Sequence, residues 1–210
     1  MLFLLAAGLT LVFGIMDFVN LAHGSLYMVG AFFCATLTFW TGSFAWAVLL
    51  AIPLTALVGL ALEMGVIRHL YQRDHLDHVL ATFGFILIAD TLVHIIWGPQ
   101  GIAIPLPEYL RGQVEILPGV IFPTFRLVII SCGLLVALGL YWLIGRTRLG
   151  MLIRAGASNR TMVSALGIDI KTLFTAVFAL GAVLAGLAGM LIAPITEATI
   201  GMGNDIIITA

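Results

Sequence analysis

The chain has 210 residues, of which 62% are hydrophobic and only 9% charged, with a mean hydropathy of +1.19 and a net charge of −1. Because soluble domains carry about 25% charged residues, this composition excludes a soluble globular protein and predicts a membrane protein. The net charge near zero provides no electrostatic basis for binding nucleic acid.

Apolar residues run in unbroken blocks, which predicts an all-α, polytopic transmembrane helical bundle and not an outer-membrane β-barrel. The predicted segments are Leu2–Met16, Ser25–Trp40, Phe44–Ile67, Val79–Trp97, Leu127–Ile144 and Leu173–Ile195. The first is too short to span a bilayer at about 1.5 Å per residue. It therefore predicts a discontinuous N-terminal segment.

A polar break separates the first two apolar segments. It contains Asp17, Asn20, His23 and Gly24. Ionisable residues at membrane depth are costly, and irregular backbone there lines cavities instead of facing lipid. We expect the break to contact a polar solute group, with the alternative that its side chains merely hydrogen-bond to one another.

Small residues recur every four positions in two later segments. They are Ala47, Ala51, Thr55 and Gly59 in one, and Gly181, Ala185 and Gly189 in the other. Helices in lipid associate through such faces because the backbones can approach closely. The pattern predicts helix packing in the bundle, and a moving helix–helix seam is the second interpretation.

Two groups of titratable residues have more than one interpretation. Asp90 and His94 lie one helical turn apart, so they form either part of a pathway or a hydrogen-bonded pair. Residues 73–78 contain two Asp and two His at a spacing that can bind a transition metal. Because charged residues are expected in a cytoplasmic loop, we interpret 73–78 as solvated and predict no metal site.

Basic residues give the orientation. Residues 68–78 and 146–171 carry seven of the nine Lys and Arg residues, so the positive-inside rule places both loops in the cytoplasm. The segment 98–126 balances two Arg with two Glu and contains five prolines, so we expect it outside.

The loop 146–171 predicts a short capped helix. Ser158 is the expected N-cap, Asn159–Leu166 forms about two turns, and Gly167 ends it. One interpretation is a membrane-surface helix anchored by Arg146, Arg148 and Arg154. We favour docking on a partner protein, because so short a helix persists only when packed. The expected docking residues are Arg154, Asn159, Arg160, Met162, Leu166 and Gly167.

The sequence contains no P-loop, H-E-x-x-H or G-x-S-x-G motif. We therefore predict no enzyme, no cofactor and no metal, and expect any ATP to be hydrolysed by another subunit. The end Asp205–Ala210 resembles the first turn of a further apolar segment. We expect 1–210 to be one transmembrane domain, a fragment that lacks C-terminal spans, and leave its N-terminus open.

Two blocks of sequence resemble the LivH-type permeases of branched-chain amino acid ABC importers. They are GLTLVFGIMDFVNLAHGSLYMVGAF (Gly8–Phe32) and TRLGMLIRAGASNRTMVSALGIDIKTLFTAVFALGAVLAGLAGML (Thr147–Leu191). A weaker match covers Thr82–Pro99. The second block resembles the family's cytoplasmic coupling loop. The chain departs from the family in stopping before its Gly-Gly-rich spans.

The resemblance implies a permease subunit in a bacterial or archaeal cytoplasmic membrane. The implied partners are a second homologous permease, two ATP-binding subunits and an extracytoplasmic substrate-binding protein, besides the lipid bilayer. Leucine, isoleucine or valine is the implied substrate, with urea, short amides or other amino acids as alternatives. We expect the pathway to include Asp17, Asn20, His23, Gly24 and Asp90.

Two other classes of protein remain possible from the residues. A secondary carrier coupled to protons or metal ions would use Asp17, Asp90 and His94, and would show inverted repeats that we do not find. An intramembrane enzyme would need an activated serine or paired carboxylates, and neither is evident.

Overall fold

The computed structural model describes residues 1–16, 18, 20–71, 73–117 and 120–209. The first half forms α1 (Leu2–Met16), α2 (His23–Thr41), α3 (Phe44–Gly65), the 3₁₀ turn η1 (Ile67–His69) and α4 (His75–Trp97). The second half forms η2 (Glu108–Leu110), β1 (Gln113–Leu117), β2 (Val120–Pro123), α5 (Thr124–Arg146), α6 (Arg148–Ser158), α7 (Arg160–Ala165), α8 (Ile170–Thr196) and α9 (Met202–Thr209).

Among the described residues, five helices are long and apolar enough to cross a membrane, namely α2, α3, α4, α5 and α8. The helix α1 is apolar but shorter than these five, as the sequence predicts for the first apolar segment. These helices confirm the polytopic bundle and the order of the apolar segments. The helices α2, α4, α5 and α8 extend past the predicted ends, because capping and interfacial residues continue the helical backbone. By contrast, α1 has the predicted bounds, and α3 ends at Gly65, before the predicted end at Ile67.

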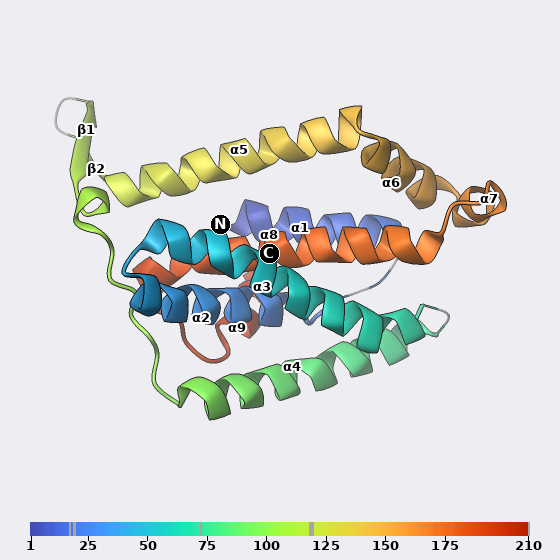
Figure 1. Ribbon diagram of the computed structural model, residues 1–210, viewed down its shortest axis with the longest axis horizontal. Coiled ribbons are helices and arrows are strands. Elements are labelled where there is room, and N and C mark those ends of the chain that lie inside the picture. The colour runs from blue at the N-terminus through green and yellow to red at the C-terminus, as the bar shows by residue number, and fades with distance from the viewer. Residues whose placement is uncertain (17, 19, 72, 118–119, 210) are drawn as a thin grey trace.

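The loops gather at two opposite ends of the bundle. Figure 1 shows α6, α7 and the connection from α3 to α4 at one end, and the hairpin of β1 and β2 at the other. The first end carries the basic loops, so we call it the cytoplasmic end. The two basic loops thus lie at the same end and the segment 98–126 at the other, as the orientation predicted from the charges requires.

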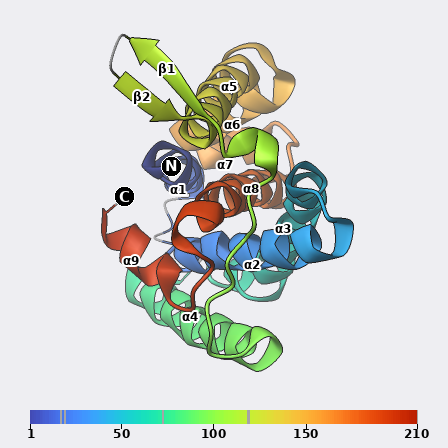
Figure 2. The same cartoon turned by 90° about the vertical axis from the view of Figure 1, so that its left-hand side faces the viewer.

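The helix α8 lies at the centre of the bundle. It packs against α1, α2 and α3, and Figure 2 shows it enclosed between them. Fifteen of its residues are buried, whereas Phe125 is the one buried residue of α5 among the described side chains. The buried core is therefore centred on α8, and α5 lies at the periphery of the bundle.

Small residues allow these close contacts, as the spacing predicts. A Cβ atom added to Gly186 would lie 2.5 Å from Thr55 Cγ2, and one added to Gly30 would lie 2.5 Å from the Gly186 Cα. Gly59 abuts Ala182 in the same way. Backbones that approach this closely gain the van der Waals contact that holds helices together in lipid.

Two elements were not predicted. β1 and β2 form an antiparallel hairpin, with Gln113 opposite Pro123 and an irregularity between Glu115 and Leu117. Such short strands within a proline-containing loop give too weak a pattern to predict. The second element is α6, which occupies residues expected to form a loop. Its apolar residues lie on one side, and Ile153 and Gly156 are buried against the bundle.

The outer end of α8 is joined to the connection after α4. Ile102 and Ala198 exchange backbone hydrogen bonds of 2.9 and 3.0 Å. Glu197 reverses the chain there with φ 66°, and α9 then turns back toward α2. The bridge thus fixes the position from which α9 enters the bundle.

Candidate functional site

The break between α1 and α2 is present but shorter than predicted. Phe18, Asn20 and the turn at 21–22 lie outside helices, whereas His23 and Gly24 already belong to the first turn of α2. No side chain caps this helix start, since its N-cap is Ala22. Asp17, which we expected in the pathway, lies outside the described residues.

Polar side chains at the break are buried without being paired. Asn20, His23 and Ser25 have exposed fractions of 1%, 0% and 2%. His23 Nε2 donates to the Leu5 carbonyl at 3.2 Å, which joins α2 to α1. Both amide atoms of Asn20, His23 Nδ1 and the Ser25 hydroxyl make no hydrogen bond with any described residue. Since buried polar groups are normally paired, these unpaired atoms make the break a candidate polar site.

The helix α9 brings two predicted pathway residues to the same place. Gly203 crosses Gly24 so closely that a Cβ on either would overlap the backbone of the other. The next residue, Asn204, donates its side-chain N–H to Asp90 at 3.4 Å. Gly24 and Asp90 thus adjoin consecutive residues of α9, while His94 is exposed.

The candidate pathway therefore includes part of α9, which sequence reasoning did not assign. Gly203 and Asn204 lie in a short segment of mixed composition, so periodicity alone gives no signal for their role. Only the three-dimensional approach of α9 to α2 places them beside the break.

The predicted docking helix forms with a different cap. Asn159, and not Ser158, is the N-cap of α7, because its Oδ1 accepts from the Met162 N–H at 2.9 Å. Ser158 is instead the last residue of α6. The helix runs from Arg160 to Ala165, and Gly167 follows it with φ 81°. An amide side chain in a non-helical N-cap satisfies this donor as well as a serine would.

The predicted apolar side of α7 divides between the bundle and the exterior. Val163 is buried, whereas Met162 and Leu166 are 62% and 73% exposed. Arg154 and Arg160 are also exposed. Large exposed apolar side chains beside cations fit both interpretations of this helix, a surface that binds a partner protein and a helix at the membrane surface.

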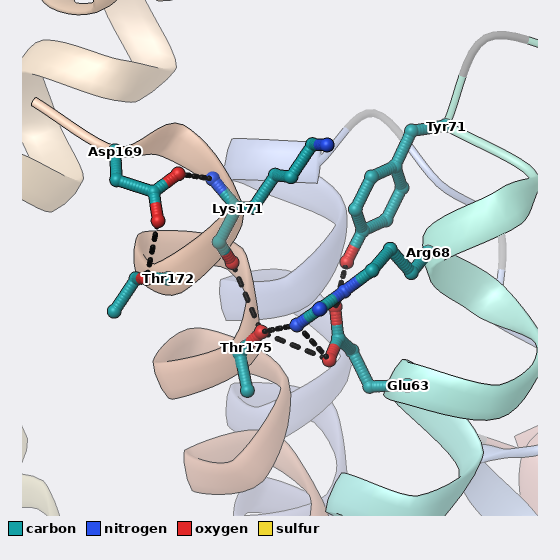
Figure 3. Close-up of polar contacts among 7 residues, drawn as sticks. All are labelled: Glu63, Arg68, Tyr71, Asp169, Lys171, Thr172 and Thr175. Carbon is teal, nitrogen blue, oxygen red and sulfur yellow. Dashed lines mark hydrogen bonds and ion pairs between the residues drawn. The ribbon is translucent and has the colours of Figure 1, made fainter.

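A cluster that sequence reasoning missed lies at the cytoplasmic end. Glu63 in α3 is fully buried, and three side chains bind its carboxylate (Figure 3). The Arg68 guanidinium lies at 3.3 Å, and the Tyr71 hydroxyl donates at 2.5 Å. The Thr175 hydroxyl of α8 lies 2.9 Å from the carboxylate and 2.9 Å from the Lys171 carbonyl oxygen, so its one hydrogen is shared between these two acceptors. We call these four residues the Glu63 cluster. The sequence contained a signal for this cluster, because Glu63 is the one acidic residue inside the apolar segment predicted at 44–67.

The environment of Tyr71 keeps its hydroxyl protonated. Burial raises the pKa of Tyr71, and the hydrogen bond to Glu63 and the negative charge of that carboxylate raise it further. The tyrosine therefore acts as a stable donor to Glu63. A carboxylate with three such partners has the compensation that burial of a charge requires.

The described side chains of residues 73–78, which do not include that of His75, give no support for a metal site. Among the described residues, no three His, Cys, Asp or Glu side chains come together at a distance suited to a metal ion. His78 is buried, with Nε2 2.8 Å from the Leu70 carbonyl oxygen and its ring 4.6 Å from that of Phe18. This histidine stabilises the loop and is not solvated as we expected.

The fold and the site define a class of protein. The described part of the chain is a multi-pass helical bundle that has a polar break beside its central helix and a short, exposed helix at the basic end. This combination is typical of a membrane permease.

The comparisons with known proteins give the family. A family model described as branched-chain amino acid transport system / permease component matches residues 1–210, so the chain belongs to this family. It is a multi-pass protein of the cytoplasmic membrane. No solved structure shows significant similarity to it.

Curated relatives are similar along most of the chain. The high-affinity branched-chain amino acid transport system permease protein BraD of Pseudomonas aeruginosa is 30% identical over 90% of this chain and 65% of its own length. The corresponding protein LivH of Salmonella typhimurium is 27% identical over the same shares. A probable branched-chain amino acid transport permease protein LivH of Methanocaldococcus jannaschii is 27% identical over 100% of this chain and 67% of its own length. The chain thus spans about two thirds of the length of these relatives.

Proposed function

We propose that this chain belongs to the membrane-spanning subunit of an ATP-driven importer, and that it forms part of the pathway for branched-chain amino acids. The observation that carries this proposal is the set of buried polar atoms without partners at Asn20, His23 and Ser25. Leaving such atoms unpaired costs about 1–3 kcal/mol for each group. A protein retains that cost where it serves binding, as it does in pathways built at helix breaks.

The surroundings of the break match an amino acid with an aliphatic side chain. The main-chain end of the substrate would meet the polar atoms and the first N–H groups of α2, which carry the positive end of the helix dipole. Apolar residues dominate the rest of the core, including Met28 and Leu26. The names of the relatives support the same substrate class.

The energy would come from outside this chain. In the proposed assembly, two such permeases pair, two ATP-binding subunits bind at α7, and an extracytoplasmic protein delivers the substrate. Movement of the ATP-binding subunits would bias the bundle between two states by contacting them differently. The exposed side chains Met162, Leu166 and Arg160 support docking at this end.

Reconstitution of the full-length polypeptide tests the proposal. Proteoliposomes that contain the permease, its ATP-binding subunits and the substrate-binding protein should accumulate radiolabelled leucine only when ATP is supplied. Valine and isoleucine should compete with leucine, and urea should not. Accumulation driven by a proton or sodium gradient without ATP would instead establish a secondary carrier and refute the proposal.

A single substitution tests the location of the pathway. Asn20→Leu removes both unpaired amide atoms at nearly constant volume, so thermal stability should stay the same or rise while leucine uptake is lost. A structural role of Asn20 predicts the opposite pattern, which is reduced stability with uptake retained in the molecules that fold. Gly14→Ala is the matched control, because a Cβ there meets no atom within 4 Å.

A further inference from the structure

The Glu63 cluster joins two helices at one point near the cytoplasmic end. Glu63 lies in the last turn of α3, and Thr175 lies in the second turn of α8. Besides its bond to Glu63, the Arg68 guanidinium donates to the Thr175 hydroxyl at 3.0 Å. The same carboxylate therefore holds α3, η1 and α8 together (Figure 3). None of these contacts contributes a side chain to the break near α2.

An aromatic pair connects this cluster to α7. The ring of Tyr71 meets the ring of Phe174 edge-on, with centroids 5.0 Å apart and an interplanar angle of 84°. The guanidinium carbon of Arg160 lies 5.6 Å from the centroid of Phe174. Each contact in this series lies in the favourable range for aromatic and cation–π interactions.

The contacts form one continuous series from the docking helix into the bundle. Arg160 belongs to α7, Phe174 is buried in α8, and Tyr71 bonds to Glu63 of α3. Because packed rings resist compression, a displacement of α7 that carries Arg160 against Phe174 would be passed on to Tyr71. A movement of Tyr71 would change the hydrogen bond from its hydroxyl to the buried Glu63 carboxylate. The series thus makes the pairing of α3 with α8 sensitive to the position of α7.

We propose that the Glu63 cluster is a latch between α3 and α8, and that α7 releases it through Phe174 and Tyr71. This inference rests on the proposed function, since it assigns to α7 a movement imposed by a partner. In it, Tyr71 and Thr175 are positioning residues that act through Glu63 and do not contact the substrate. Release of the latch lets the cytoplasmic ends of α3 and α8 separate while the glycine contacts nearer the middle persist.

Two variants that each remove one hydroxyl group test the latch. Tyr71→Phe keeps the aromatic contact with Phe174, and Thr175→Val keeps the volume of the side chain. Each should be introduced into the full-length permease, assembled with its ATP-binding subunits and substrate-binding protein, and reconstituted in liposomes. The measured quantity is the leucine taken up for each ATP hydrolysed.

The latch predicts that this ratio falls about tenfold in either variant, the factor that corresponds to one hydrogen bond to a charged group. The double variant should be no worse than the worse single variant, because both substitutions disable the same latch. Tyr141→Phe in α5 is the control, since this tyrosine is 77% exposed and should leave the ratio unchanged.

Unchanged ratios in both variants would overturn the inference, even if their melting temperatures fell, because a purely structural cluster affects stability without affecting coupling. If one variant does not assemble, the other decides the question. Failure of the proposed function itself is seen separately, as absence of ATP-dependent leucine uptake by the wild-type assembly.

Discussion

The contact between α3 and α8 makes a quantitative prediction about Gly186→Ala. The new Cβ would lie 2.5 Å from Thr55 Cγ2 and 3.1 Å from Thr55 Cβ. Carbon atoms pack best at about 3.5–4.0 Å, so the two helices would have to separate by about 1 Å or Thr55 would have to move. Thr55 is fully buried and its hydroxyl donates to the Ala51 carbonyl at 2.8 Å, so it has little freedom to move.

Overpacking of this kind costs about 1–3 kcal/mol, and we expect Gly186→Ala to lower the free energy of unfolding by that amount. Thr55→Ser removes the clashing methyl group and keeps the hydroxyl. Alone it should cost about 0.8 kcal/mol, the value for one buried methylene. In the double variant, however, the two effects should partly cancel, by about 1 kcal/mol or more relative to their sum.

Thermal unfolding of the full-length protein in detergent, followed by circular dichroism, measures these differences. Gly139→Ala in α5 is the control, because a Cβ there meets nothing within 4 Å. Equal effects of Gly186→Ala and Gly139→Ala, or strict additivity with Thr55→Ser, would refute the packing argument.

Two further predictions concern the cytoplasmic end. Replacing both Met162 and Leu166 with Asp should weaken copurification of the ATP-binding subunits at least about tenfold without lowering the melting temperature. The control Ser164→Asp on the same helix should leave copurification unchanged. Copurification of the double variant at the wild-type level would refute the docking role. Asp169→Ala should lower the melting temperature and Asp169→Asn should do so less, because Asp169 accepts from the Lys171 N–H at 2.9 Å as the N-cap of α8. Hydrogen bonds from Thr172 and from the Lys171 N–H lower the pKa of Asp169. The stabilising effect of this carboxylate should therefore be complete at neutral pH and disappear as the pH falls through the lowered pKa. A melting-temperature difference between wild type and Asp169→Ala that persists below that pH would contradict this assignment.

Much of the fold could be predicted because lipid imposes simple rules on sequence. Unbroken apolar blocks predicted the spanning helices, and small residues at a spacing of four predicted which faces of α3 and α8 are buried. Gly167 predicted the end of the docking helix, since it adopts φ 81°. These signals are local or periodic, so they survive without any knowledge of tertiary contacts.

The remaining features depend on contacts between distant residues. Glu63 and Thr175 lie 112 positions apart, and the approach of Gly203 to Gly24 spans most of the chain. The choice of Asn159 over Ser158 as cap depends on where α6 ends, which is set by its packing on the bundle. The solute-binding roles of Asn20, His23, Gly24 and Asp90 stay predictions. The structure brings Gly24 and Asp90 to α9 without testing their part in transport.

The central position of α8 has a consequence for how this protein can diverge. The glycines of α8 contact three neighbouring helices, α1, α2 and α3. A larger side chain in place of one of these glycines would therefore overlap atoms of a neighbouring helix. In the proposed pathway, adaptation to a new solute is therefore easier through residues of α2 and α9 at the break than through α8.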